Sequence, residues 1–285
     1  GNNSITSGEN TINRGNNCLV IGSGSQVLGG QDNLVIGKVN TLRDGEASQN
    51  LISGIKNTIN GSAETLNNIL VGANHALGIS GNSNTGVKNY ALFGSGNRVN
   101  TTTSGTEADV QVGMLAGRNN FSRGDVAHII GGGSSIYGDS NTLVGFNNRA
   151  GSSTTDKTKN IIIGENIISE SSSVTLIGYG MSGVATSVNQ FVAVGRHPDT
   201  DASGADYSVP SNTTFMVGAA TQQNFKRNAI IVTAKSSNST GDESNVILPG
   251  VGKYRNYSSD SAAATGGVPL YGIYHNNGDL KIRIT

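Results

Sequence analysis

The chain has 285 residues, with 41 glycines, no tryptophan and only 13% charged residues. Gly, Asn, Ser and Thr are poor helix formers, so this composition excludes a mainly helical protein. Disordered chains are usually highly charged, so the low fraction of charged residues in this chain argues against disorder. The 19 basic and 19 acidic residues cancel, and without a basic surface we expect no nucleic-acid partner. No apolar run approaches the ~18 residues of a membrane-spanning helix, so we expect no membrane insertion.

A short motif of apolar residues followed by glycine recurs along the chain. Leu19-Val20-Ile21-Gly22 is its first clear copy, and Ile5-Thr6-Ser7-Gly8 is a weaker one. Successive anchor glycines lie 14 to 23 residues apart, at positions 8, 22, 37, 54, 72, 94, 117, 131, 145, 164, 178, 195 and 218. A minimal unit with variable insertions is typical of a solenoid, so we predict an all-β stack of short coils.

A second apolar residue follows each glycine after four or five positions, and polar turn formers lie between them. We predict that this residue marks a second short strand in each coil, at Val27, Leu42, Ile59, Leu77, Val99, Phe121, Ile136, Ala150 and Ile168. Glycine and asparagine suit the two turns because they adopt positive φ at little cost.

The first strand of each coil is apolar without alternation. The position two before the glycine is apolar in twelve of thirteen copies, and its neighbours are mostly apolar too. A strand with one wet face alternates, whereas a continuous apolar run indicates burial on both faces. One face can fill the coil, but the other needs a partner. The simplest partner is another copy of the chain, so we expect an obligate homo-oligomer.

The remaining segments are polar insertions and a different ending. Four insertions, at 78–88, 100–112, 150–159 and 196–212, are expected to form exposed loops, where binding residues often lie. After Gly218 we predict one more strand at 229–232 and a hairpin at 267–284 around Asn277-Gly278. Ile282 and Ile284 alternate with basic residues, which gives this hairpin one wet face. We divide the chain into a repeat domain, 1–225, and a C-terminal strand, linker and hairpin that form a cap or tip, 226–285.

The repeat resembles the head of YadA-type trimeric autotransporter adhesins, in which a small apolar strand, a glycine and a polar turn recur. The resemblance covers roughly residues 1–225. It implies a left-handed parallel β-roll in a homotrimer, with the strand faces forming the trimer core. The irregular insertions and the missing coiled-coil neck depart from that pattern.

The ending resembles the C-terminal close of many bacteriophage tail-fibre and other virion proteins, through Val246-Ile247-Leu248-Pro249, Gly272, Tyr274 and the run from Asn277 to Ile282. Together the two resemblances imply a non-enzymatic, trimeric appendage of a virion that binds a host cell-surface glycan or protein. Three alternatives remain: an adhesin head on a bacterial cell surface, a tailspike enzyme that cleaves polysaccharide, and a purely structural spacer.

Two motifs suggest specific ligands. Asp199, Asp201 and Ser203 resemble the start of a calcium loop, and Asp206 adds another oxygen ligand. Pro210 stands where such a loop places its bidentate glutamate, so a solvated turn is the alternative. The run from Gly178 to Gly183 matches G-x-G-x-x-G, but the next strand follows too soon for the helix of a dinucleotide site. We therefore interpret it as a repeat turn and expect no organic cofactor.

Isolated residues give no catalytic assignment. Cys18 is expected to be a small buried apolar residue. The histidines occur singly, without the spacing of a zinc site, at positions 75, 128, 197 and 275. Glu165 and Glu170 are possible members of a glycosidase carboxylate pair formed between subunits. Tyrosines able to stack on sugars lie at positions 137, 179, 207, 254, 257, 271 and 274.

Overall fold

The computed structural model describes residues 2–43, 47–60, 65–78, 87–99, 112–152, 154–181, 190–196, 213–219, 228–233, 245–249 and 255–285. The chain forms two compact units, Gly1–Ser173 and Val174–Thr285. The first is a parallel β-solenoid, in which a long and a short strand alternate along the chain. The all-β solenoid predicted from the repeat is confirmed.

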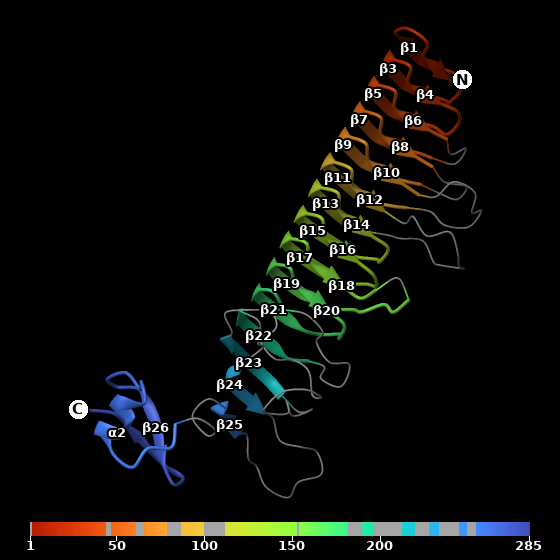
Figure 1. Cartoon of the computed structure of the whole chain (residues 1–285). Coiled ribbons are helices and arrows are strands. Elements are labelled where there is room, and N and C mark those ends of the chain that lie inside the picture. The colour runs from red at the N-terminus through yellow and green to blue at the C-terminus, as the bar shows by residue number, and fades with distance from the viewer. Residues whose placement is uncertain are drawn as a thin grey trace, which may run out of the picture. The chain divides into compact units, whose positions relative to one another are not determined.

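The long strands of the first unit form one parallel sheet, in which each strand pairs with the next one in the series (Figure 1). They are Ile5–Ser7 (β1), Leu19–Ser23 (β3), Leu34–Lys38 (β5), Leu51–Ile55 (β7), Ile69–Ala73 (β9), Tyr90–Ser95 (β11), Gly113–Arg118 (β13), Ala127–Gly132 (β15), Asn141–Phe146 (β17) and Ile161–Glu165 (β19).

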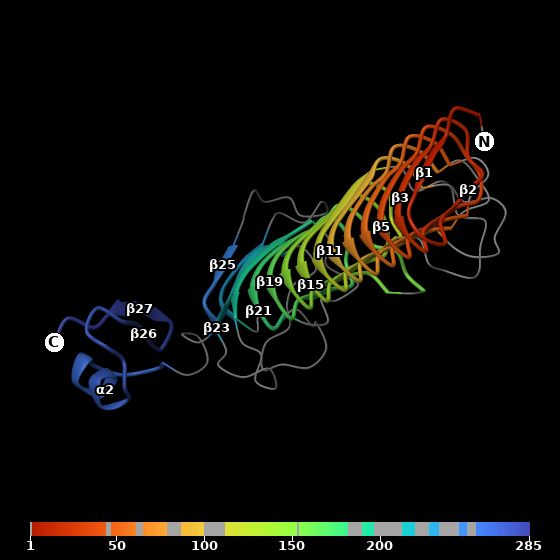
Figure 2. The same ribbon diagram turned by 90° about the horizontal axis from the view of Figure 1, so that it is seen from above.

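The short strands form a second parallel sheet of ten strands. They are Ile12–Asn13 (β2), Gln26–Val27 (β4), Thr41–Leu42 (β6), Thr58–Ile59 (β8), Ala76–Leu77 (β10), Arg98–Val99 (β12), Phe121–Ser122 (β14), Ser135–Ile136 (β16), Arg149–Ala150 (β18) and Ile168–Ser169 (β20). Figure 2 shows the coils of this unit stacked one behind the other.

The anchor glycines stack directly on one another, as the repeat predicts. Gly22 pairs with Gly37, and Gly131 pairs with Gly145, in the ladder of long strands. Gly145 has a φ of 118°, a conformation that L side chains rarely adopt. A Cβ there would lie 2.8 Å from the carbonyl carbon of Gly164 in the next coil, and nearer still to its oxygen. Glycine is therefore required both by the backbone conformation and by the close approach of the coils.

The core of each coil is filled from both sheets. The residue two before each anchor glycine points inward, and Val20, Leu92 and Leu143 are among those fully buried. The residue five after the glycine points inward from the short strand, as Val27 and Leu77 do. Both sheets thus contribute inward side chains to a thin, continuous core, and most of these side chains are large and apolar.

Two short strands correct the sequence prediction. Phe121 and Ile168 are only half-buried, and Ser122 and Ser169 occupy the inward positions beside them with no exposed surface. The spacing from the anchor glycine is five residues in every described coil from β4 onward, so the prediction of four residues here was wrong. The register of the stack decides which side chain faces inward, because each short strand pairs in step with its neighbours.

A ladder of buried polar side chains closes the turn after the long strands. Asn97 is fully buried; its amide donates to Phe93 O at 2.8 Å, and its Oδ1 accepts from the backbone N–H of Asn120 at 3.1 Å. Equivalent positions hold Asn40, Asn57, His75, Asn120, Ser134 and Asn148. Each member satisfies backbone groups that the turn leaves unpaired, so the asparagines are structural parts of the core.

The second unit begins with parallel strands and ends with antiparallel ones. Thr175–Tyr179 (β21), Val192–Arg196 (β22) and Thr213–Ala219 (β23) pair in parallel. Asn228–Thr233 (β24) and Asn245–Ile247 (β25) then add antiparallel strands. The strand predicted at 229–232 is confirmed, and its antiparallel pairing marks the end of the parallel repeat.

Residues 255–285 contain a short helix and two paired strands. Asp260–Thr265 (α2), which the sequence analysis did not predict, is capped by the Ser259 side chain. Ile273–Asn276 (β26) and Asp279–Ile282 (β27) pair antiparallel around Asn277-Gly278. Both turn residues have positive φ, as a two-residue hairpin turn requires.

Candidate functional site

The outer face of the long-strand sheet in the first unit presents a stripe of apolar side chains to solvent. On each strand the residues one and three before the anchor glycine point outward, on either side of the buried residue. Ile21 and Ile130 are 40% and 48% exposed, whereas Val20 between Leu19 and Ile21 is fully buried. The parallel register aligns these residues into two columns, as the pairs Leu19–Leu34 and Ile21–Ile36 show. We call this set of residues the outer stripe.

The outer stripe is mostly apolar. Across the ten strands from β1 to β19 it has twenty positions, and sixteen are apolar; the others are Ser7, Ser53, His128 and Thr142. In three of the strands a charged side chain stands one residue after the glycine, at the strand end: Lys38, Arg118 and Glu165. Large contiguous apolar patches are rare on the surface of monomeric proteins and are typical of interaction sites.

The outer face of the short-strand sheet differs in chemistry. Six of its ten outward residues are polar, namely Gln26, Thr41, Thr58, Arg98, Ser135 and Arg149, and the other four are Ile12, Ala76, Phe121 and Ile168. Strands with this pattern suit a sheet that packs on one side and meets water on the other. The first unit therefore has one wet sheet face and one apolar face.

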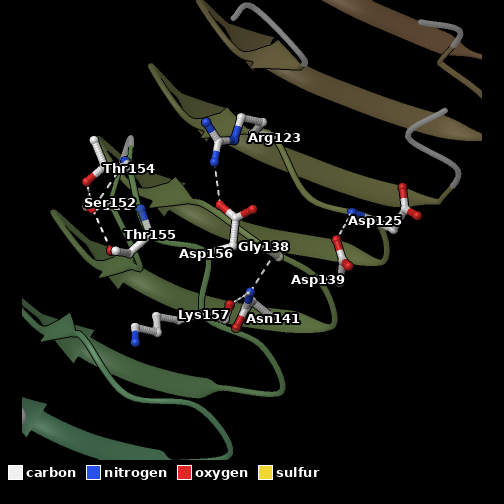
Figure 3. Close-up of polar contacts among 10 residues, drawn as sticks. All are labelled: Arg123, Asp125, Gly138, Asp139, Asn141, Ser152, Thr154, Thr155, Asp156 and Lys157. Carbon is white, nitrogen blue, oxygen red and sulfur yellow. Dashed lines mark hydrogen bonds and ion pairs between the residues drawn. The ribbon is translucent and has the colours of Figure 1, made fainter. Parts of the chain in front are cut away.

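The insertion at 150–159 is held against the coils (Figure 3). Asp156 in this insertion pairs with Arg123, which follows β14. Lys157 donates its backbone N–H to Tyr137 O at 3.0 Å, and Asn141 donates its amide to Lys157 O at 2.7 Å. These contacts bring the loop onto two earlier coils, so the part that the structure describes acts as a brace.

Tyr137 lies beneath this brace. Its ring packs against Phe121, with 5.2 Å between centroids, and the Arg123 guanidinium lies 5.5 Å from the centroid. Ring and guanidinium attract through the quadrupole of the aromatic face. Tyr137 is thus already packed on two sides, which favours a structural role over sugar stacking. Residues 79–86, 101–111 and 197–212, which make up most of the other three insertions, lie outside the described residues.

His75 replaces asparagine in the buried ladder. Its Nδ1 accepts from the backbone N–H of Asn97 at 3.3 Å, and Nε2 lies 3.1 Å from Val71 O. The neutral ring must therefore carry its proton on Nε2 and donate it to Val71. Burial lowers the pKa of His75, and the hydrogen bond to Val71 opposes that shift. A protonated Nδ1 would lose its role as acceptor.

The predicted calcium ligands fall in a part of the chain that the structure does not describe. The calcium candidates Asp199, Asp201, Ser203 and Asp206 lie outside the described residues. Among the residues that are described, no group of three or more His, Cys, Asp or Glu side chains is placed to hold a metal. Gly178 pairs with Gly195 in the ladder of β21 and β22, so the start of the G-x-G-x-x-G run is an anchor glycine of the repeat.

The candidate cysteine, glutamates and histidines lie in different parts of the structure. Cys18 is buried and free, as predicted. Glu165 ends β19 in the long-strand sheet, whereas Glu170 follows β20 in the other sheet and pairs with Arg149 at 3.6 Å. His128 belongs to the outer stripe and His275 to β26, and His197 lies outside the described residues.

The tyrosines considered for sugar stacking differ in exposure and packing. Tyr179 and Tyr271 are 39% and 75% exposed, and Arg196 lies 5.2 Å above the ring of Tyr179. Tyr257 and Tyr274 pack in the small C-terminal core, and Tyr207 and Tyr254 lie outside the described residues. Tyr90, which the sequence analysis did not single out, is buried and donates to Gly124 O at 2.8 Å. Burial raises the pKa of its hydroxyl.

In comparisons with known proteins, no protein-family model, no curated protein and no solved structure matches this chain. Within the described residues, no helix has the length and hydrophobicity to cross a membrane.

Proposed function

We propose that this chain is a non-enzymatic appendage protein that assembles as a homotrimer through the outer stripe and binds a receptor on a host cell surface. The observation that carries the proposal is the stripe itself, with sixteen apolar residues among twenty outward positions. Large exposed apolar surfaces are typical of protein–protein interaction sites, which favours self-association through the stripe.

The geometry of the stripe suits a trimer. It consists of two parallel columns, so each chain can offer one column to each of its two neighbours around a three-fold axis. The resemblance to YadA-type heads supports the same arrangement and adds a left-handed roll. Charged residues at the strand ends, such as Lys38 and Arg118, would then lie at the rim of the interface, where polar residues are normally found.

The resemblance of the C-terminal ending supports a bacteriophage tail fibre or another virion appendage as the assembly. The receptor proposed is a host surface glycan, with a surface protein as the other class. Three copies on one fibre would strengthen weak individual contacts, because linked binding events raise the overall avidity by ~10²–10⁴-fold.

A binding assay tests this function. The full chain and an Ile130→Lys/Ile163→Lys variant would be applied to a panel of immobilised bacterial lipopolysaccharides and capsular polysaccharides. We expect the intact protein to bind a subset of the panel, and the variant to lose at least tenfold in apparent affinity because it has lost multivalency. Equal affinity of the two proteins would contradict the trimeric mode, and shortening of the polysaccharide would replace a binding function by an enzymatic one.

A further inference from the structure

Phe146 is the most exposed aromatic residue among those that the structure describes in the first unit. It ends β17, one residue after an anchor glycine, and is 59% exposed. Phe93, the next most exposed, is 39% exposed and belongs to the outer stripe. Phe146 stands beyond the stripe, at the position that Arg118 fills in β13 and Glu165 fills in β19. An aromatic ring in this row of charged residues needs an explanation other than the stripe.

The Phe146 ring rests against the backbone of the preceding coil. Its register partner in β15 is Gly132. A Cβ at Gly132 would lie 3.3 Å from both Cδ1 and Cε1 of the ring, which is closer than the ~3.5–4.0 Å at which carbon atoms pack comfortably. Because glycine leaves this space open, the ring lies close over the strand, and Gly132 beneath it is buried. The ring is therefore supported on one side and open to solvent on the other.

Charged side chains flank the ring along the sheet. The adjacent strands β13, β15, β17 and β19 (Figure 1) carry Arg118, Gly132, Phe146 and Glu165 in register, and we call these four residues the Phe146 row. Arg118 and Glu165 are exposed, and a carboxylate oxygen of Glu165 accepts from Nδ2 of Asn166 at 3.3 Å. Adjacent strands lie ~4.8 Å apart, so the row is ~14 Å long. It offers hydrogen-bond donors at one end, acceptors at the other and an aromatic surface between them.

The chemistry of the Phe146 row suits a sugar better than an apolar protein surface. An apolar partner would have to bury Arg118 and Glu165, and the burial of charged groups without partners is costly. A sugar ring has a C–H face that packs on an aromatic ring, and hydroxyl groups at its edge. Hydrogen bonds between such hydroxyl groups and ionised side chains are among the stronger ones in proteins. A short oligosaccharide can therefore cover the ring and reach the charged ends of the row.

We propose that the Phe146 row is a glycan-binding subsite, in which one sugar ring stacks on Phe146. Its hydroxyl groups hydrogen-bond to Glu165 and, further along the row, to Arg118. The inference rests on the receptor-binding role of the proposed function and assigns residues to it. Three copies of the subsite in a trimer would lie beside the outer stripe, where a polysaccharide with repeating units can occupy more than one of them.

Substitution of the ring in the full chain tests the subsite, with the panel of immobilised lipopolysaccharides and capsular polysaccharides as the probe. Phe146→Ala removes the stacking surface, so we expect the apparent affinity for the panel members that the parent binds to fall at least tenfold. Phe146→Tyr keeps a ring and should stay within threefold of the parent. Ile55→Ala is the matched control, because Ile55 also follows an anchor glycine and is 49% exposed but has no ring. It should bind as the parent does.

A fluorescent reporter gives a second, independent readout. The chain contains no tryptophan, so Phe146→Trp places a single indole in the row and keeps a surface for stacking. Titration with a bound polysaccharide of the panel should shift the emission of this indole and protect it from quenching by acrylamide. An Ile55→Trp reporter, at the same position of another coil, should show neither change. Equal responses of the two reporters would count against a sugar at Phe146.

The solution mass of the same variants separates the subsite from the proposed function. If Phe146→Ala binds as the parent does at an unchanged mass, the subsite is overturned and the receptor-binding trimer stands. A lower mass of Phe146→Ala would also overturn the subsite, because the ring would then belong to the interface between chains. A parent protein that binds no member of the panel would overturn both the subsite and the proposed function.

Discussion

Replacing one anchor glycine by alanine should break the stack locally. We choose Gly145→Ala, because this glycine lies in the middle of the first unit and pairs with glycines on both sides. Its φ of 118° lies in a region in which a side chain costs ~1–3 kcal/mol. A Cβ at this position would lie 2.8 Å from the carbonyl carbon of Gly164, whereas carbon atoms pack comfortably at ~3.5–4.0 Å.

Relief of this clash requires the two coils to separate by ~1 Å, which weakens the ladder hydrogen bonds around it. Each of these contributes ~1 kcal/mol net, so the loss of two or three of them, added to the ~1–3 kcal/mol of backbone strain, gives a total of ~4 kcal/mol. Typical domains have ~5–15 kcal/mol of stability in all. Urea unfolding followed by far-UV circular dichroism should therefore show a clearly lower midpoint for the variant.

Gly24→Asn is the matched control. Gly24 has a φ of 63°, and the nearest atom to a Cβ there is Val39 Cγ2 at 3.7 Å. Asparagine already occupies the equivalent turn position at Asn10 and Asn74, with φ of 53° and 56°. The control should change the free energy of unfolding by less than ~0.5 kcal/mol. If Gly145→Ala unfolds at the same midpoint as this control, the close approach of the glycines does not determine stability.

Three further predictions concern the turns and the buried ladder. Asn97→Ala should destabilise the protein by ~1–3 kcal/mol, because it leaves the buried Asn120 N–H without the acceptor that Asn97 Oδ1 provides; an unchanged urea midpoint would contradict this. Val126 has a φ of 51°, which costs a β-branched residue ~1–2 kcal/mol, so Val126→Asn should raise the midpoint, and a decrease would count against the assigned backbone. The pKa of His75 is lowered in the folded state, so the unfolded chain binds the proton more tightly and stability falls as pH drops below ~6.5. His75→Asn should remove that part of the pH dependence, and an identical pH profile in both proteins would refute the assignment.

The repeat could be predicted from the sequence because the anchor position of each coil requires glycine. No other residue fits the close approach at Gly22 or Gly145, so the glycines mark the register. The inward position two residues earlier, as at Val20, then follows from alternation along a strand. The apolar residues on both sides of it, such as Leu19 and Ile21, were visible as well, and they remain a prediction of self-association.

Other features were not accessible because they depend on neighbouring coils. Ser122 lies inward and Phe121 outward only because the short strands pair in step with those before and after them. The turn residues between the two strands do not reveal the buried ladder by themselves, although asparagine recurs three residues after the glycine, as in Asn40 and Asn97. Helix α2 was missed because its alanine run is short, and Ser259 before it was the available signal.

The solution mass of the full chain, measured by light scattering after size exclusion, tests the central claim most directly. The account predicts a mass near three times 29.2 kDa, and a shift to lower mass in the Ile130→Lys/Ile163→Lys variant, which places charges in the outer stripe. A stable monomer would contradict the account, because sixteen apolar side chains on one sheet face would then need a different cover.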